Sequence, residues 1–497
     1  MTAKESFTFI DTFAGCGGLS LGLRAAGGQE ILAIEKSPMA AETYYHNFIE
    51  RLPTADATEQ FSERLAQWNN RVSSPELDTP QLIVDDIWNV IKDQDLLSYL
   101  ESLDVDLISG GPPCQGFSMA GTRQGFDTDA RNSLVFAFHK FIMSIKPKIV
   151  LMENVDGIRH AFTTPNGKQK GPKPIEEVVE CFESGAGTPN ATIYRVQRLL
   201  LNAQNYGVPQ RRNRVILFCV RNDIFEATSP LITEDYLYSA SGTPLRDTVL
   251  PKSITPSFTV DDAIGEFYSN VSIDNTKYLE TLKILSQELI SSAHGGIANH
   301  NHRNHSDRVR NRFSLYQTLS KLEDQQLDES LLHQPKNVST GRAHLENQRE
   351  KVERLYQLLK LKESETARII NFNNGIEAIQ SFVSVDELLK YLENYTTKKH
   401  TQRVMVRDQA APTVLTIPDD HVHPTEPRTL TVREMARLQS FPDEFEFRSK
   451  ETTGGLKRKE EVPQYTQVGN AVPPLLGMAL GKKASKVLKI NSLLHNK

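Results

Sequence analysis

One cysteine of this chain stands in a loop whose composition suits a nucleophile. Residues 109–118 (SGGPPCQGFS) follow the mostly apolar run 105–108, which we expect to be a short buried strand. Pro112 and Pro113 fix φ just before Cys114 and lower the entropy cost of ordering the loop. A cysteine alone on a tight turn is more often a buried core residue, so the assignment of Cys114 as a nucleophile depends on its neighbours.

A carboxylate follows a second apolar strand in an equivalent position. Residues 149–151 (IVL) precede Glu153, which lies in the segment MENV at 152–155. In open α/β sheets the functional site lies outside the carboxyl ends of the strands, so Cys114 and Glu153 are predicted to converge on one crevice. The alternative for Glu153 is a structural carboxylate at a helix N-cap.

The alternation of apolar runs with helical stretches predicts an α/β fold with a doubly wound, mainly parallel sheet. Residues 225–405 are polar and irregular, apart from helical periodicity at about 346–361, and predict a smaller, irregular domain. Residues 163–174 are expected to form an exposed loop. The expected strands are 7–11, 31–35, 82–84, 105–109, 149–153 and 214–220, and the first two helices are 18–26 and 39–47.

Polar residues and glycines at three successive strand ends predict a nucleoside site. Residues 11–18 (DTFAGCGG) link the first strand to the first helix, and their glycines allow a ligand to approach the backbone. Their spacing differs from the Gly-x-Gly-x-x-Gly of dinucleotide folds. Glu35 lies about 20 residues further on, where a carboxylate binds ribose hydroxyls, and Asp86 could accept a hydrogen bond from an adenine amine. S-adenosylmethionine fits this pattern, although each residue could instead cap a helix or form a turn.

The overall charge is unusual for a nucleic-acid-binding protein, because the formal net charge is −5 at pH 7. A surface that binds nucleic acid must therefore be local. Runs of basic residues are more often solvated helix faces, and both interpretations stay open here. The two candidate runs are residues 307–312, with Arg308, Arg310 and Arg312, and residues 398–403, with Lys398, Lys399, His400 and Arg403.

The cysteine content and the absence of long apolar runs favour a cytoplasmic protein. The four cysteines (Cys16, Cys114, Cys181, Cys219) lack metal-like pairing and are too few for a disulfide framework. No run approaches the roughly 18 apolar residues of a membrane helix. A histidine tract could bind metal, but Cys and acidic partners at ligand spacing are missing, so no metal is expected. The tract comprises His294, His300, His302 and His305.

Six motifs in one order resemble those of the cytosine-5 DNA methyltransferase family, in its bacterial restriction-modification form. The resemblance covers most of the chain outside about 225–405. One motif departs slightly, since Asp85 stands where the family often has glycine, which leaves Asp86 and Ile87 in the matching places. The motifs are residues 11–18, 111–115 (GPPCQ), 153–155 (ENV), 210–214 (QRRNR), 433–442 (REMARLQSFP) and 467–474 (QVGNAVPP).

The resemblance implies a Rossmann-like fold, S-adenosylmethionine as the methyl donor, and double-stranded DNA as the substrate. Cys114 would add to carbon 6 of a flipped cytosine, so that carbon 5 can take the methyl group. Glu153 would contact ring nitrogen 3 and the exocyclic amine. Arg214 would bind the carbonyl oxygen and Arg212 would orient the acid or the backbone; the alternative is that both arginines only bridge strands.

The resemblance also assigns binding residues and domains. Residues 1–224 would form the catalytic and cofactor-binding domain, residues 225–439 the target-recognition domain, and residues 440–497 a segment that folds back to close the first. We expect a monomer, with a cognate restriction endonuclease as a functional partner. The implied DNA contacts are Gln115, Ser118, Arg131 and Gln210. The implied cofactor contacts are Phe13, Gly15, Gly17, Gly18, Leu19, Glu35, Asp86, Ile87, Pro112, Asn470 and Val472.

Three other functions compete with this hypothesis. The tRNA-methylating branch of the same family is one, but its Cys-Phe-Thr element is not evident. A DNA-binding member without activity is the second, and the intact Cys114, Glu153 and Arg214 argue against it. A small-molecule oxidoreductase is the third, and the glycine spacing is wrong for it.

Overall fold

The structure is a computed structural model, and it describes most of the chain. The described residues are 6–52, 81–113, 132–159, 162–163, 169–170, 174–184, 192–228, 257–268, 273–290, 297–322, 324, 326–363, 367–455, 457 and 460–495. Within them, no helix is both long and apolar enough to cross a membrane.

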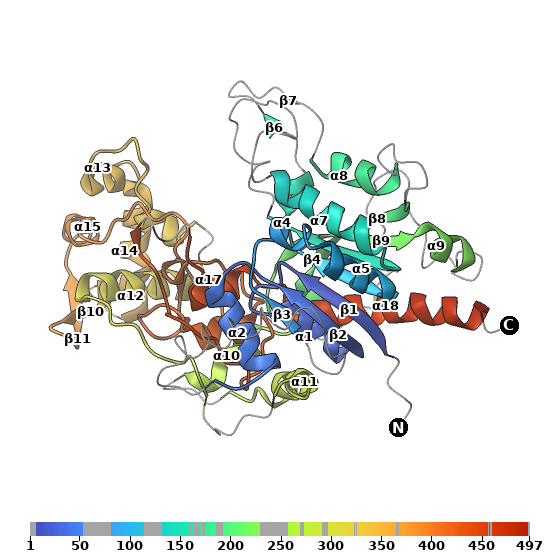
Figure 1. The fold of residues 1–497 in the computed structure, drawn as a ribbon. Coiled ribbons are helices and arrows are strands. Elements are labelled where there is room, and N and C mark those ends of the chain that lie inside the picture. The colour runs from blue at the N-terminus through green and yellow to red at the C-terminus, as the bar shows by residue number, and fades with distance from the viewer. Residues whose placement is uncertain are drawn as a thin grey trace.

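A seven-stranded sheet organises the larger lobe (Figure 1). Its order is β3-β2-β1-β4-β5-β9-β8; the first five strands pair in parallel, and β9 runs antiparallel to both β5 and β8. The strand order reverses between β1 and β4, which places a crevice at their carboxyl ends. The predicted doubly wound α/β fold is confirmed. The strands are β1 (Phe7–Thr12), β2 (Gly28–Ile34), β3 (Gln81–Ile83), β4 (Leu107–Gly110), β5 (Ile149–Asn154), β8 (Tyr194–Asn202) and β9 (Asn213–Arg221).

The sheet is buried on both faces, which explains why its strands read as continuous apolar runs. Successive residues of a strand alternate between two hydrophobic clusters: Leu107 joins one and Ile108 the other. Helices α5 (Gln94–Ser102), α7 (Asn132–Ile145) and α8 (Pro174–Glu183) contribute to the second cluster, whereas α1 (Gly18–Ala25) and α2 (Pro38–Phe48) contribute to the first. Short elements complete this lobe: α4 (Ile87–Val90), η1 (Asp156–Arg159), β6 (Phe162–Thr163), β7 (Gln169–Lys170), η3 (Ala203–Tyr206) and α9 (Asn222–Thr228).

The C-terminal segment returns to the first helix. Helix α18 (Pro474–His495) packs along α1, as the red and blue helices beside the sheet show in Figure 1. The backbones approach closely because Gly22 has no Cβ, and one added there would overlap the Pro474 carbonyl oxygen. Helices α16 (Val432–Leu438) and α17 (Gln464–Asn470) join the same hydrophobic cluster. Thr431 and Glu434 form a capping box at the start of α16.

The smaller lobe, which was predicted to be irregular, combines helices with two short two-stranded sheets. It has its own hydrophobic cluster, which runs from Phe313 to Val422. Helix α14 (Arg349–Glu363) lies where helical periodicity was predicted, at about 346–361, and it buries Val352, Leu355, Tyr356 and Leu359 along one stripe. The elements are α12 (Asp307–Lys321), η6 (Glu329–Leu332), α13 (Gly341–Glu346), α14 (Arg349–Glu363), β10 (Ala367–Asn373), β11 (Ile376–Phe382), α15 (Val385–Glu393), β12 (Arg403–Val404), η7 (Pro418–Asp420) and β13 (His421–Val422).

The boundary between the two hydrophobic cores falls inside the predicted 225–439 domain. Helices α10 (Val260–Ile264) and α11 (Thr276–Ser286), with η5 (Gly265–Phe267) between them, pack into the cluster of the larger lobe. Tyr278 is fully buried there and donates a hydrogen bond to the Arg437 carbonyl. Residues 260–268 and 273–286 therefore belong to the larger lobe, and the separate core of the smaller lobe begins near Phe313.

Candidate functional site

The carboxylate and one guanidinium of the predicted site meet at the carboxyl edge of the sheet. Glu153 lies near the end of β5, and Arg214 lies at the start of β9, which pairs antiparallel with β5. Arg214 Nε lies 2.7 Å from Glu153 Oε1, and the two side chains are 10% and 13% exposed. An ion pair that is largely withdrawn from water is held in a fixed geometry beside the crevice.

Arg212 belongs to the interior. Its side chain donates three hydrogen bonds to backbone carbonyls: Nη1 to Val414 at 3.1 Å, and Nη2 to Gly469 at 2.7 Å and to Ala471 at 3.2 Å. Burial, with a further contribution from the charge of Arg214, lowers the pKa of this guanidinium well below its usual range. These bonds join the residue just before β9 to Val414 and to the end of α17, so Arg212 is a structural link in the interior.

The loop that leads to the predicted nucleophile is anchored beside Glu153. Asn154 Nδ2 donates a hydrogen bond of 3.0 Å to the carbonyl of Pro112. Gly111 lies against Glu153, and a Cβ added there would be 3.0 Å from Glu153 Oε2. Cys114 follows directly and, like Gln115, Ser118 and Arg131, lies outside the described residues.

The carboxylates predicted to hold a nucleoside lie at the ends of β2 and β3. Glu35 Oε2 accepts the Gly15 N–H at 2.8 Å and Oε1 accepts the Ser37 N–H at 2.7 Å, while burial raises its pKa. Asp86 caps α4 by accepting the Trp88 N–H at 3.0 Å. Its other oxygen accepts from Lys36 Nζ at 2.8 Å. Each carboxylate therefore already accepts hydrogen bonds from within the protein. Its remaining lone pairs can accept hydrogen bonds from a ligand.

The glycines of residues 11–18 serve two purposes. Gly15 has φ +59° and no atom lies within 4 Å of a Cβ built on it, so its α-carbon faces open space. Gly17 and Gly18 lie against protein instead, because a Cβ would overlap the Phe48 ring at Gly17 and the Val472 carbonyl at Gly18. Only Gly15 therefore offers its backbone to a ligand.

The remaining predicted cofactor residues surround the same edge. Phe13 is half-buried with φ +53° and meets Phe138 edge-on at 6.4 Å. The exposed Asn470 lies at the end of α17. A partly exposed aromatic ring, an open glycine and a strand-end carboxylate fit an adenosine group. Leu19, Ile87, Pro112 and Val472 are buried beside them.

Gln210, predicted to contact DNA, is instead 0% exposed. Its Nε2 donates to the Leu438 carbonyl at 3.1 Å and to Gln439 Oε1 at 3.0 Å, and its Oε1 accepts the Val414 N–H at 2.9 Å. A side chain with all of these groups engaged in the interior has no surface to offer DNA. Gln210 therefore joins the start of β9 to α16.

Sequence reasoning assigned no role to Asp11, which links three elements below the crevice. Asp11 is 1% exposed and accepts hydrogen bonds of 2.6 Å from both Ser20 Oγ and Ser109 Oγ. Burial raises its pKa to about 6. A charged residue inside an otherwise apolar strand was the available signal, because such a residue must find partners.

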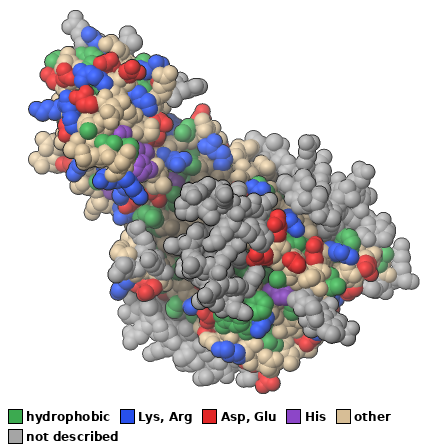
Figure 2. All heavy atoms as spheres, turned by 90° about the horizontal axis from the view of Figure 1, so that it is seen from above, with side chains coloured by type: hydrophobic (Ala, Val, Ile, Leu, Met, Phe, Trp, Pro, Cys, Tyr) green, Lys and Arg blue, Asp and Glu red, His purple; other side chains and the backbone are tan. Residues whose placement is uncertain are grey.

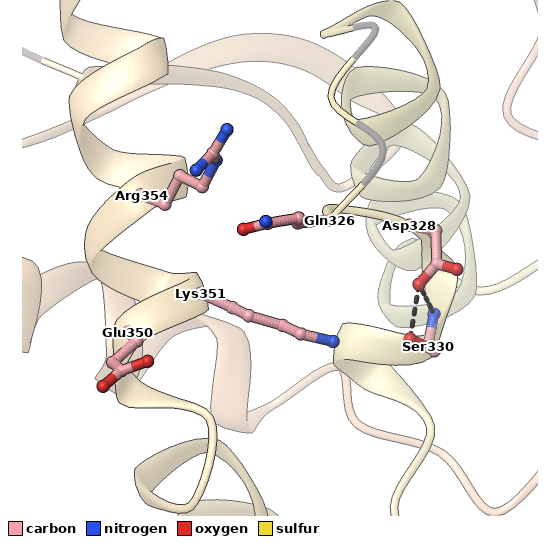
Figure 3. A pocket seen from close by; sticks show the side chains of 6 residues that line it. All are labelled: Gln326, Asp328, Ser330, Glu350, Lys351 and Arg354. Carbon is pink, nitrogen blue, oxygen red and sulfur yellow. Dashed lines mark hydrogen bonds between the residues drawn. The ribbon is translucent and has the colours of Figure 1, made fainter.

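A cavity of about 530 Å³ opens in the smaller lobe, away from these residues. Arg354, Lys351 and Gln326 point into it, and Asp328 and Ser330 bond to each other at its far side (Figure 3). Arg354 Nε is paired with Asp324 Oδ2 at 2.6 Å. The cavity mixes both signs of charge and contains none of the predicted site residues. Among the described residues, no group of three or more His, Cys, Asp and Glu is placed to hold a metal ion.

An α/β protein of the Rossmann-like methyltransferase class is what this topology and its crevice define. The model of the C-5 cytosine-specific DNA methylase family matches residues 7–70 and 79–486. The chain belongs to that family and is a methyltransferase, which confirms the family predicted from the six motifs.

Curated relatives align with nearly the whole chain. The type II methyltransferase M.DdeI of Desulfomicrobium norvegicum is 29% identical over 98% of this chain and 90% of its own length. The type II methyltransferase M.AgeI of Thalassovita gelatinovora is 29% identical over 95% of this chain and 98% of its own length. Among solved structures, the Dnmt2 methyltransferase of S. pombe is 13% identical over 97% of this chain and 98% of its own, with a TM-score of 0.41.

Proposed function

We propose that the protein transfers a methyl group from S-adenosylmethionine to carbon 5 of a cytosine in a specific duplex DNA sequence, as the modification enzyme of a type II restriction-modification system. The Glu153–Arg214 ion pair beside the anchored Gly111–Pro112 backbone is the observation that carries the chemistry. The names of the relatives, type II methyltransferases, support the biological setting.

The reaction needs a nucleophile because carbon 5 of cytosine is itself unreactive. The Cys114 thiolate adds to carbon 6, and the electron pair of the 5,6 double bond makes carbon 5 an enamine carbon that takes the methyl group. A base then removes the carbon 5 proton, and the Cys114 sulfur leaves as thiolate. Glu153, at ring nitrogen 3 and the amine, and Arg214, at the carbonyl oxygen, offset the charge that develops on the ring.

The residues at the other strand ends would hold the methyl donor, which supplies an electrophilic methyl group on a sulfonium. Glu35 would bind the ribose hydroxyls, and Asp86 with Ile87 and Phe13 the adenine. Gly15 gives close access to the backbone, and Asn470 and Val472 close the site from the C-terminal segment. Gly17, Gly18 and Leu19 would shape the loop and Pro112 its opposite wall.

The target base lies inside a duplex, so it must leave the stack before Cys114 can reach carbon 6. Base flipping costs a few kcal/mol, which contacts to the displaced strand and the phosphates must offset. Gln115, Ser118 and Arg131, on the loop after Cys114, are proposed to contact DNA. The smaller lobe is proposed to read the sequence, since contacts to base edges specify a site and phosphate contacts position the protein.

The experiment uses purified protein, labelled S-adenosylmethionine and a duplex DNA library, followed by bisulfite sequencing. Methylated cytosines in one shared short context are expected. Cys114→Ser and Cys114→Ala should bind S-adenosylmethionine as wild type does and transfer no methyl group. Substantial transfer by either variant would exclude the covalent mechanism, and transfer to tRNA but not to duplex DNA would exclude the DNA substrate.

A further inference from the structure

The two basic runs of the sequence come together on the smaller lobe. Arg308, on α12, donates from Nε to the Asn394 carbonyl at 2.9 Å. The end of η6 pairs with the chain just before the second run, since Thr397 N donates to the Leu332 carbonyl at 2.8 Å. His333 then faces His400, with ring centroids 5.9 Å apart. In Figure 2, Lys and Arg side chains gather with His side chains on this lobe.

Arg312 is the unusual residue of this face. It is 8% exposed, yet no hydrogen bond or ion pair joins its guanidinium to another described residue, and its Nε is buried without a partner. Burial lowers the pKa of Arg312, and the charge of Arg308, one turn earlier on α12, lowers it further. The Arg312 guanidinium lies over the Phe313 ring, 5.9 Å from its centroid, but a buried cation without an ion pair is costly, and so are like charges at i and i+4.

The carboxylate that acts electrostatically on Arg312 is already engaged by other cations. Asp419 contributes to the electrostatics of Arg312, but its Oδ1 lies 2.9 Å from Arg303 Nη1 and its Oδ2 lies 2.7 Å from Lys399 Nζ. Of the other acids nearby, Asp307 accepts from the Gly375 N–H, and Asp420 accepts from Thr401 Oγ1. Both oxygens of Asp419 are therefore engaged by other cations, and neither forms an ion pair with Arg312.

His333 is a neighbour of Arg312 that carries no charge. His333 Nε2 is a second buried nitrogen without a partner. Burial, His400 and Arg312 all lower the pKa of His333, and together they hold it at about 4. The ring is therefore neutral near pH 7 and adds no positive charge beside Arg312.

We propose that Arg312, with Arg308, binds a backbone phosphate of the DNA substrate. The inference rests on the proposed function, because it takes duplex DNA as the ligand. A planar guanidinium binds a phosphate through two parallel hydrogen bonds, and α12 holds Arg312 rigidly for that purpose. A chain with a net charge of −5 needs such a local cationic site to bind DNA at all. The contact positions the smaller lobe and carries no sequence information.

The test measures binding of a fluorescent duplex of arbitrary sequence by anisotropy over a range of salt concentrations. Arg312→Gln should weaken binding about tenfold on every sequence, and the slope of log K against log salt should fall by about 0.9, the value for one phosphate contact. Arg308→Gln should act in the same direction. The matched control is Arg354→Gln on α14, whose charge Asp324 already neutralises, and it should bind as wild type does.

Thermal melting and S-adenosylmethionine binding confirm that each variant is folded. If Arg312→Gln does not fold, the salt dependence of Arg308→Gln, a change at an exposed residue, tests the phosphate site alone. Unchanged affinity and unchanged salt slope in a folded variant would overturn the phosphate site, and so would a loss confined to one DNA sequence. The proposed function is judged separately, by methyl transfer from the wild-type protein, and fails only if that transfer is absent.

Discussion

Arg214 and Glu153 form an ion pair of 2.7 Å although they lie on strands that run in opposite directions. The reversal is what brings them together, because the first residues of an antiparallel strand lie beside the last residues of its neighbour. A parallel strand in the place of β9 would carry its start to the far edge of the sheet. The antiparallel direction of β9 thus places Arg214, at its start, at the edge of the sheet where the parallel strands end.

Arg214→Ala removes the partner of a carboxylate that is only 13% exposed. Methyl transfer should fall by a factor on the order of 10²–10³, as for loss of one charged donor in an active site. S-adenosylmethionine affinity should stay unchanged in equilibrium titration. The control is Arg221→Ala at the other end of β9, where Arg221 pairs with Asp223. Wild-type turnover in Arg214→Ala would show that the pair is structural.

Asn154 holds the loop before Cys114 through the Pro112 carbonyl. In Asn154→Ala this loop loses its anchor, and we expect kcat to fall about tenfold, equivalent to one hydrogen bond of about 1.4 kcal/mol. The KM for S-adenosylmethionine should not change. Asn154→Asp keeps an acceptor for the Val155 N–H but has no donor for Pro112. It should lose as much activity as Asn154→Ala; full activity in Asn154→Asp would exclude the anchor as the cause.

Gln210→Ala tests the reassignment of Gln210 from a DNA contact to an interior link. The change leaves the Val414 N–H and the Leu438 carbonyl without partners, so the free energy of unfolding should fall by about 1–3 kcal/mol in a denaturant titration. The salt dependence of DNA binding should equal that of wild type. A smaller salt slope with unchanged stability would restore Gln210 to the DNA surface.

The strand ends could be predicted from the sequence because the signals are local. Apolar runs of three or four residues, each followed by a polar residue, place Glu35, Asp86 and Glu153 at one edge once the sheet is parallel. The interior role of Arg212 could not be predicted, because its partners Val414 and Gly469 lie more than 200 residues away in sequence. The residues next to an arginine in the sequence do not indicate which distant backbone carbonyls will accept its hydrogen bonds.

The close packing of α1 on α18 leaves no room for a side chain at Gly22. In Gly22→Ala the Cβ would overlap the Pro474 carbonyl and lie 2.5 Å from Met478 N, and backbone atoms cannot move aside easily. Overpacking of this kind costs about 1–3 kcal/mol, which thermal melting should detect as a lower Tm. Gly454→Ala is the matched control, since no atom lies within 4 Å of its added Cβ and its φ is not positive. Equal melting of the two variants would mean that α18 can shift away.

Glu30 should make the stability of the protein depend on pH. Its side chain is 0% exposed, and burial raises its pKa from 4.5 to about 7, although Arg24 at 3.7 Å partly opposes the shift. Because the folded-state pKa lies above the unfolded value, the unfolded chain releases this proton first. The free energy of unfolding must then fall as the pH rises from 4.5 to about 7, and it levels off above that range.

The variant Glu30→Gln keeps the shape of the side chain and has no proton to release. The free energy of unfolding of this variant, taken relative to that of wild type, should rise by on the order of 2 kcal/mol from about pH 5 to about pH 8. Urea unfolding at the two pH values measures it. Asp11, whose pKa burial raises to about 6, titrates in both proteins, so its own pH dependence largely cancels in the difference. A difference that does not change with pH would mean that Glu30 is ionised in the folded protein, with Arg24 compensating its charge fully.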